Sequence, residues 1–488
     1  MALFLLCCLA WAGCVGALSR QAGRSVEGEA LGAQAAAARQ VFHATEATDI
    51  FSSASISLHP PSPPTFAIAA DNGSPYLAVY SAAGAEAWRW SSPCAGCSLA
   101  SSTARHVELD PVAPGKVDTF AIQSGNGACT VMGFDGEGSG APAWSADLEG
   151  CSELARGGVG GTYTGLAASD DGRALAVLGY GQDTPGGNLT ARAYLISGQT
   201  GKLAWKYDLG VREHAGQGDI SIGRDYVAFI NEDGSPSPNA AQLHVLGVAT
   251  GALRAEVQIP FFIAGAITDD GEYVVVQNFT HLKGSEPWVL RWDASASAYL
   301  LLHRLALPAD GTEYDLWDIS IPGGPSSYVA LGWISAIPSA LLLRVTAYDL
   351  ASGALLTDWS APPNAQLQNN PTIRCDGKYI GLGLWGDSGE APTAVILAAG
   401  SNAALFNATS PGSMFSVDLA LDRGTLYIAT AGKHVVRRES ARGGRAPRVT
   451  NSPPPPSFHT RTPLPPAHTQ PANEMGAGGD AYGWSVTV

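Results

Sequence analysis

The side chains best suited to binding or catalysis recur at equivalent positions of four short segments. They are His106 (His-Val-Glu), Asp219 (Asp-Ile-Ser), Asp318 (Asp-Ile-Ser) and Asp418 (Asp-Leu-Ala). If these segments are inner strands of a ring-shaped repeat fold, their side chains face a common axis. Carboxylates that converge there with a histidine would bind a cation or a polar ligand. The alternative is structural: each Asp caps a turn or hydrogen-bonds a neighbouring unit.

Two further patterns carry weaker chemical signals. The Gly-Asp-Ser-Gly segment at 386–389 matches the motif that carries the catalytic serine of trypsin-like serine proteases. That chemistry needs a histidine base and a buried Asp, and no matching Ala-Ala-His-Cys phrase occurs. The Asp-Asp-Gly turns at 170–172 and 269–271 lack the alternating oxygen ligands of a calcium loop. We interpret the Gly-Asp-Ser-Gly segment as a loop and both Asp-Asp-Gly segments as tight turns.

The elements that would position these residues repeat along the chain at intervals of roughly forty residues, the length of a propeller blade. In each repeat an apolar strand ends in a small-residue turn with Gly, and a second apolar or Trp-bearing strand follows. Clear copies lie at 76–88, 194–205, 243–253 and 345–359. Other hairpins turn at Asp-Gly, a pair that tolerates the left-handed backbone a tight turn requires. The sequence therefore predicts an all-β fold, a β-propeller of four-stranded blades.

Both signals together predict eight blades, with seven as the alternative. The predicted blades span 53–91, 104–148, 164–208, 217–258, 264–306, 316–360, 370–410 and 414–438. The last lacks an outermost strand, and residues 40–45 have the composition to supply it. An N-terminal strand in the last blade would close the ring and remove an open sheet edge.

The ends of the chain differ from the repeats. Residues 1–17 are apolar and end in small residues, as in a secretory signal peptide. Residues 18–39 look like a flexible leader, and the propeller is predicted over 40–438. Residues 439–488 are rich in Pro and Gly, so we expect a disordered tail.

Cysteines and glycosylation sequons support an oxidising compartment. Five cysteines follow the predicted signal peptide. Cys129 and Cys151 flank a predicted hairpin and should form a disulfide, while Cys94 and Cys97 are close enough to form a second. Cys375 is then left as a buried thiol. The N-glycosylation sequons start at Asn188, Asn278 and Asn407.

Composition excludes some partners. The 488 residues carry a formal net charge of −15, and only 15% are charged. Such an acidic chain is a poor match for nucleic acid or an anionic membrane surface. Apart from the predicted signal peptide at residues 1–17, no stretch is long and apolar enough to span a bilayer.

The hairpins at 194–205 and 347–353 resemble the repeat of quinoprotein-type (PQQ-like) β-propellers. In that family a Trp in each repeat locks neighbouring blades together, and the resemblance places Trp88, Trp144, Trp205 and Trp359 at this position. Cofactor-using members add a vicinal disulfide, a calcium site and a catalytic Asp, and the sequence after the predicted signal peptide has no adjacent Cys pair and no such constellation. The resemblance therefore implies the scaffold without a bound quinone, and we expect no cofactor.

Two functional hypotheses follow. The first is a secreted, non-catalytic propeller that acts as an extracellular interaction or matrix module and binds a protein or a glycan. A Ser-Pro-Pro-Pro-Pro segment at 452–456 resembles the repeat of extensins, which adds association with a cell wall as an alternative location. The second hypothesis is a propeller enzyme, a quinoprotein-like oxidoreductase or a glycan-active enzyme, that uses the central funnel. Polar side chains converging in the channel would keep the second hypothesis open.

Overall fold

The computed structural model describes most of the repeat region and the last residues of the chain. The described ranges are 38–46, 51–59, 62–70, 75–94, 97–104, 117–155, 165–184, 187–212, 218–232, 241–259, 264–280, 284–307, 309–310, 312–325, 327–335, 342–361, 372–386, 392–410, 412–433 and 479–488. All regular elements within these ranges are β-strands. Accordingly, no helix that could cross a membrane occurs in them.

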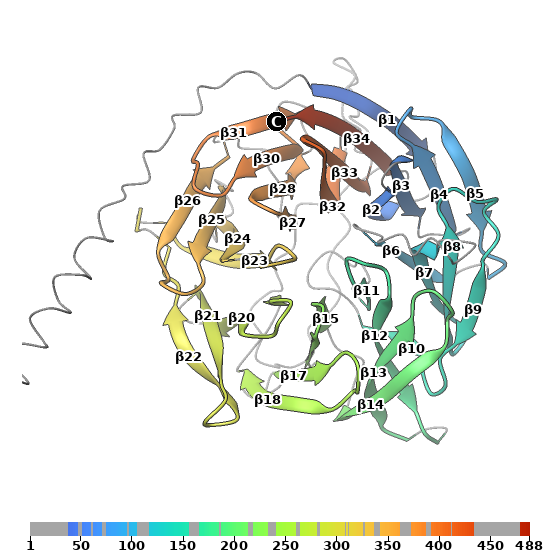
Figure 1. Cartoon of the computed structure of the whole chain (residues 1–488), viewed down its shortest axis with the longest axis horizontal. Helices are drawn as coiled ribbons and strands as arrows, with labels where there is room; N and C mark the ends of the chain where they lie inside the picture. The colour runs from blue at the N-terminus through green and yellow to red at the C-terminus, as the bar shows by residue number, and fades with distance from the viewer. Residues whose placement is uncertain are drawn as a thin grey trace, which may run out of the picture. The chain divides into compact units, whose positions relative to one another are not determined.

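The strands form eight antiparallel sheets arranged as blades in a ring (Figure 1). The prediction of an all-β propeller with eight blades is therefore confirmed, and the seven-bladed alternative is wrong. In blades 1, 2 and 4 to 7 the sheet order follows the chain from the innermost strand outward, whereas blades 3 and 8 depart from this order. The innermost strands of all eight blades face the centre of the ring.

The first four blades are regular, with one addition. Blade 1 contains β2 (Phe51–His59), β3 (Ser62–Ala70), β4 (Tyr76–Ser81) and β5 (Glu86–Ser91); blade 2 contains β6 (Ser98–Thr103), β7 (Val117–Gly125), β8 (Ala128–Asp135) and β9 (Trp144–Asp147). Blade 3 contains β10 (Glu153–Leu154), β11 (Leu166–Ala168), β12 (Ala174–Gln182), β13 (Leu189–Ser197) and β14 (Leu203–Arg212); blade 4 contains β15 (Gly218–Ile222), β16 (Tyr226–Glu232), β17 (Ala241–Gly247) and β18 (Leu253–Ile259). Two short strands, β10 and β11, pair with the same strand of blade 3.

The other four blades complete the ring. Blade 5 contains β19 (Gly265–Ile267), β20 (Tyr273–Thr280), β21 (Gly284–Asp293) and β22 (Ala298–Arg304); blade 6 contains β23 (Tyr314–Ser320), β24 (Tyr328–Ser335), β25 (Leu343–Asp349) and β26 (Leu355–Ser360). Blade 7 contains β27 (Thr372–Asp376), β28 (Tyr379–Gly383), β30 (Ala394–Ala398) and β31 (Ala404–Ala408); blade 8 contains β29 (Trp385–Gly386), β32 (Gly412–Asp422), β33 (Thr425–Lys433), β34 (Gly479–Thr487) and β1 (Ala38–Glu46).

The hydrophobic core lies between the blades. One buried cluster joins Val345 of β25 in blade 6 to Ile380 of β28 in blade 7, and similar clusters fill other junctions. Both faces of a blade are therefore covered. This explains why the middle strands are nearly continuous apolar runs instead of alternating ones.

Indole groups join the first blades as the resemblance implied. The N–H groups of Trp88, Trp144 and Trp205 each donate a 2.9 Å hydrogen bond to a carbonyl oxygen in the following blade. The acceptors are Gly136, Gly198 and Val248. Each ring also packs against the turn glycine of that next blade, at Gly140, Gly201 and Gly251.

The assignment of Trp359 to this position is wrong. In blade 6 the residue that follows the equivalent bulge is Thr357, whose Oγ1 accepts a 2.8 Å hydrogen bond from the backbone N–H of Gly400 in blade 7. Trp359 stands two residues further along β26 and packs in the core with Ile373. Trp205 follows the turn glycine Gly201 by four residues, as Thr357 follows Gly353, whereas Trp359 follows Gly353 by six. The spacing from the turn glycine therefore excludes Trp359 from this position.

Both ends of the described chain complete the last blade. The outermost strand is β1, which contains the predicted closing residues 40–45 and pairs with β34. The prediction of a disordered tail over 439–488 is wrong for residues 479–487, because these form β34 between β33 and β1. Its side chains Tyr482 and Trp484 are buried and stacked on one another, 5.5 Å between ring centroids.

The cysteine pairs are those expected from the sequence. Disulfides join Cys129 to Cys151 and Cys94 to Cys97. The first links β8 to the turn after β9, so it fixes the outer hairpin of blade 2. Cys375 of β27 is buried and retains its thiol, which donates to the carbonyl oxygen of Ser320.

Candidate functional site: the central channel

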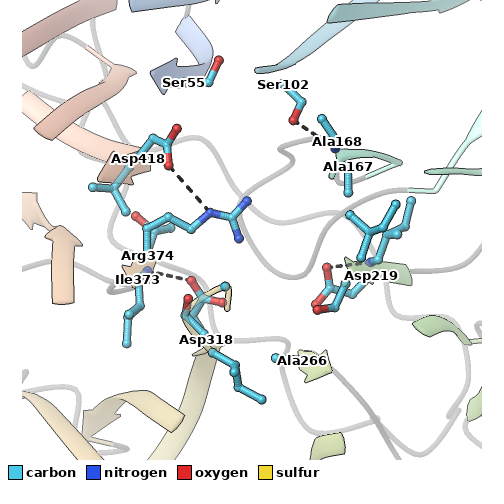
Figure 2. Close-up of a pocket in the computed structure, with 18 of the residues that line it drawn as sticks. Ser55, Ser102, Ala167, Ala168, Asp219, Ala266, Asp318, Ile373, Arg374 and Asp418 are labelled. Carbon is cyan, nitrogen blue, oxygen red and sulfur yellow. Dashed lines mark hydrogen bonds and ion pairs between the residues drawn. The ribbon is translucent and has the colours of Figure 1, made fainter. Parts of the chain in front are cut away.

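The innermost strands of all eight blades line a central cavity of about 280 Å³ (Figure 2). Its wall is rich in hydroxyl groups, contributed by Ser53, Ser55, Ser101, Ser102, Thr103, Ser221, Ser320, Thr372 and Ser416. Eight strands converge there, so small polar side chains fit where larger ones would block the centre. The charged side chains of the wall are Asp170, Asp219, Asp269, Asp318, Arg374 and Asp418. The channel is therefore polar.

Three of the four side chains singled out from the sequence line this cavity. Asp219 lies on β15, Asp318 on β23 and Asp418 on β32. His106 lies outside the described residues, and the prediction that it begins the inner strand of blade 2 is wrong. That strand is β6, which ends at Thr103. The error arose because the Ser-rich sequence of β6 carries little of the apolar pattern used to align the repeats.

Each of the three carboxylates connects two blades. In Asp219 one oxygen accepts the backbone N–H of Ile220 (2.9 Å) and the other accepts that of Gly265 in blade 5 (3.2 Å). Asp318 accepts from Ile319 (2.8 Å) and from Ile373 in blade 7 (2.7 Å).

Asp418 repeats this arrangement at the closing junction. It accepts from Leu419 (3.0 Å) and from Ile56 in blade 1 (2.8 Å). The observed contacts therefore fit the structural interpretation, in which each Asp hydrogen-bonds a neighbouring blade. The same pattern of hydrogen bonds occurs at three separate junctions.

A serine two residues away in each strand makes a parallel contact. The Oγ atoms of Ser221, Ser320 and Ser416 accept backbone N–H groups of the next blade at 3.0 to 3.1 Å. The donors are Ile267, Cys375 and Ala54. The Asp-Ile-Ser phrase that drew attention in the sequence is therefore a two-point contact between blades.

A metal site is not supported by the described residues. Within the described ranges, no group of three His, Cys, Asp or Glu side chains is arranged to hold a metal ion. The three Asp residues instead surround the side chain of Arg374, which extends into the cavity from β27 (Figure 2). Its Nε lies 4.0 Å from Oδ1 of Asp418.

Two of the carboxyl groups titrate unusually. Burial raises the pKa of Asp219 to about 6, against the lowering effect of its backbone hydrogen bonds and of Arg374. Burial also raises the pKa of Asp318 to about 7, and the negative charge of Asp219 adds to that shift. Desolvation is therefore the main cause, and like-charge repulsion between the carboxylates is secondary.

The loop after β23 reaches across one end of the channel. The backbone N–H of Gly324 donates a 2.6 Å hydrogen bond to Oδ2 of Asp269 in blade 5. Its neighbour Gly323 lies against the carboxylate of Asp170 in blade 3. The second Asp of each Asp-Asp-Gly turn does make the expected turn bonds, from Arg173 N–H to Asp171 and from Glu272 N–H to Asp270. Sequence reasoning missed that the first Asp of each pair contacts this loop of blade 6, Asp269 from the neighbouring blade 5 and Asp170 from the more distant blade 3.

The remaining sequence candidates lie away from the channel. Asn188 and Asn407 are exposed, on the edge of β13 and in β31 respectively. Asn278 lies in β20. Residues 387–389 of the Gly-Asp-Ser-Gly segment lie outside the described residues.

Comparisons with known proteins give limited information. No protein-family model matches the chain, and no curated protein matches it. A solved structure from a study entitled "Structural and Mechanistic Analysis of Two Prolyl Endopeptidases: Role of Inter-Domain Dynamics in Catalysis and Specificity" is similar over 65% of this chain, with 13% identity and a TM-score of 0.38. The similar region spans 45% of the length of that chain. At this level the likeness supports no statement about activity.

Proposed function

We propose that this chain is a secreted, non-catalytic β-propeller that acts as an extracellular binding module for a protein or a glycan. The apolar segment 1–17, the exposed Asn188 and Asn407 sequons and the disulfides support an oxidising, secretory route. The quinoprotein-type repeat enters this proposal only as a scaffold, without a quinone. The Pro-rich phrase at 452–456 makes cell-wall association an alternative location within the same proposal.

The observation that carries the proposal is the use of the channel carboxylates. Asp219, Asp318 and Asp418 each accept two backbone hydrogen bonds that connect blades. A general base must lie within hydrogen-bond reach of a substrate proton, and each oxygen of these groups already accepts a backbone N–H of the framework. Such a channel is suited to binding, with its polar wall acting as a rigid surface.

A second candidate function is an enzyme that uses the same channel. One observation favours it: a carboxyl group with a pKa of about 7, that of Asp318, is matched to proton transfer near neutral pH. The enzyme would be a quinoprotein-like oxidoreductase, the class that the repeat resemblance suggests, or a glycan-active enzyme. Turnover of such a substrate that is abolished by Asp318→Asn would favour this candidate.

The experiment is expression of the full chain in a eukaryotic secretion host. We expect the protein in the medium, the signal peptide cleaved near residue 17, and a mass decrease on enzymatic removal of N-glycans. Asn188→Gln and Asn407→Gln variants would assign the sites. The secreted protein would then be tested for binding on glycan and extracellular-protein arrays, and for turnover of sugars and alcohols. Retention inside the cell without glycans would refute the proposed route, and turnover would refute the non-catalytic role.

A further inference from the structure

Arg374 is the unexplained charge of the channel. Its side chain is 50% exposed although it lies within the ring, and its one ion pair among the described residues is the 4.0 Å approach to Asp418. Its guanidinium donates no hydrogen bond to any described protein group. A planar guanidinium with free donors recognises a carboxylate in two-point geometry.

Carboxyl groups lie opposite the Arg374 guanidinium in the cavity. Asp219 and Asp318 line the same cavity, and Figure 2 shows the guanidinium extending between Asp418 and these two side chains. Each carboxylate oxygen uses one lone-pair direction for a backbone N–H and retains another for a ligand donor. One side of the cavity thus offers donors and the other offers acceptors.

We propose that the channel binds a small zwitterion that carries a carboxylate and an ammonium group, the carboxylate on Arg374 and the ammonium group at Asp219 and Asp318. The inference rests on the proposed role of the channel as a binding site and names its ligand class. An ammonium group supplies up to three donors, which matches the acceptors that the two Asp side chains retain.

Charge excludes the simpler ligands. The five Asp side chains of the wall and Arg374 leave four negative charges when all are ionised. A plain anion would face that excess, whereas a plain cation would lie close to the guanidinium. A zwitterion adds no net charge and contacts each side with the opposite sign.

The test is calorimetric titration of the purified full chain at pH 8 with glycine, β-alanine and γ-aminobutyric acid, which separate the two charges progressively. Acetate and methylammonium are the half-ligand probes. We expect at least one amino acid to bind about tenfold or more tightly than either half. Binding of all three amino acids no more tightly than acetate or methylammonium would overturn the inference.

Variants locate the site. Arg374→Gln should weaken binding of the best amino acid by about tenfold or more, and Asp318→Asn should weaken it while leaving acetate unchanged. Arg304→Gln, on the outermost strand of blade 5, is the matched control and should bind like the wild type. Equal affinity in the wild type and Arg374→Gln would also overturn the inference. Circular dichroism of each variant checks that it is folded.

Failure here differs from failure of the proposed function. If no amino acid binds but the secreted glycoprotein still captures an extracellular partner, the ligand class is wrong and the module stands. If an amino acid binds and is chemically converted, the ligand class stands and the non-catalytic role is wrong.

Discussion

Replacing Gly251 by alanine tests how indole groups lock neighbouring blades. Gly251 ends the β17–β18 turn with φ +66°, and a Cβ there would lie 2.7 Å from Cγ and 2.8 Å from Cδ2 of Trp205. The left-handed backbone costs an alanine roughly 1 kcal/mol. Moving the indole aside also strains its 2.9 Å hydrogen bond to Val248, worth roughly 1 kcal/mol, and disturbs its packing. We expect a total loss of about 2–4 kcal/mol in unfolding free energy.

Gly377 provides the matched control. It has φ +55° in the turn between β27 and β28, and a Cβ at this position would meet nothing within 4 Å. Gly377→Ala should therefore lose only the conformational part, roughly 1 kcal/mol. Urea unfolding followed by Trp fluorescence measures both variants against the wild type.

A double-mutant cycle separates the packing part. In a Trp205→Ala background the clash at Gly251 is removed, so Gly251→Ala should cost about as much as Gly377→Ala does in the wild type. Equal destabilisation by the two glycine variants in the wild type, or an unchanged cost of Gly251→Ala without the indole, would refute the interlocking role of Trp205.

Three further predictions concern the channel, the ring closure and blade 2. Because the pKa values of Asp219 and Asp318 are raised by folding, the native state binds more protons than the unfolded state between pH of about 4 and 7, so the unfolding free energy should fall as pH rises through this window. Asp318→Asn should make melts at pH 5 and pH 8 differ less than in the wild type, and an unchanged difference would contradict the assignment. Deleting residues 1–50 removes β1 and should lower the melting temperature by many degrees; an unchanged melt would show that the strand does not close the ring. Serine at both Cys129 and Cys151 should cost roughly 3 kcal/mol in urea unfolding, whereas no loss would mean that the disulfide does not stabilise blade 2.

The blade count was predictable because it depends on local signals. Each Asp-Gly or Thr-Gly turn places a glycine with a left-handed backbone between two apolar runs, as at Gly201 (φ +68°) and Gly271 (φ +65°). These signals do not depend on what the blade packs against. Counting them therefore gave eight blades.

Strand β34 could not be predicted by the same means. Its sequence, Gly-Asp-Ala-Tyr-Gly-Trp-Ser-Val-Thr, has no turn signal that ties it to β33, because residues 434–478 intervene. Its place in the sheet depends on pairing with β33 on one side and β1 on the other, contacts distant in sequence. Composition averaged over 439–488 concealed nine residues of strand.

The candidate site was predicted in part. The Asp-Ile-Ser phrase correctly indicated residues that face the channel, since inner strands share one position in every blade. Arg374 was missed because the comparison of the repeats followed recurring Asp residues, whereas Arg374 occupies the position that Ser221 and Ser320 occupy in β15 and β23. It lies on the same face of its strand as those serines, but a search for a repeated residue type does not find a different residue at an equivalent position.

The seam of the ring uses the same contacts as the interior junctions. Asp418 and Ser416 bind blade 1 as Asp219 and Ser221 bind blade 5, so the junction where the chain closes is not chemically weaker than the others. Asp418 is also the carboxylate nearest to Arg374. A ligand that draws the guanidinium away from Asp418 would therefore act on a residue that already holds blade 8 to blade 1. The channel and the closure of the propeller share one side chain, which joins binding in the centre to the stability of the whole ring.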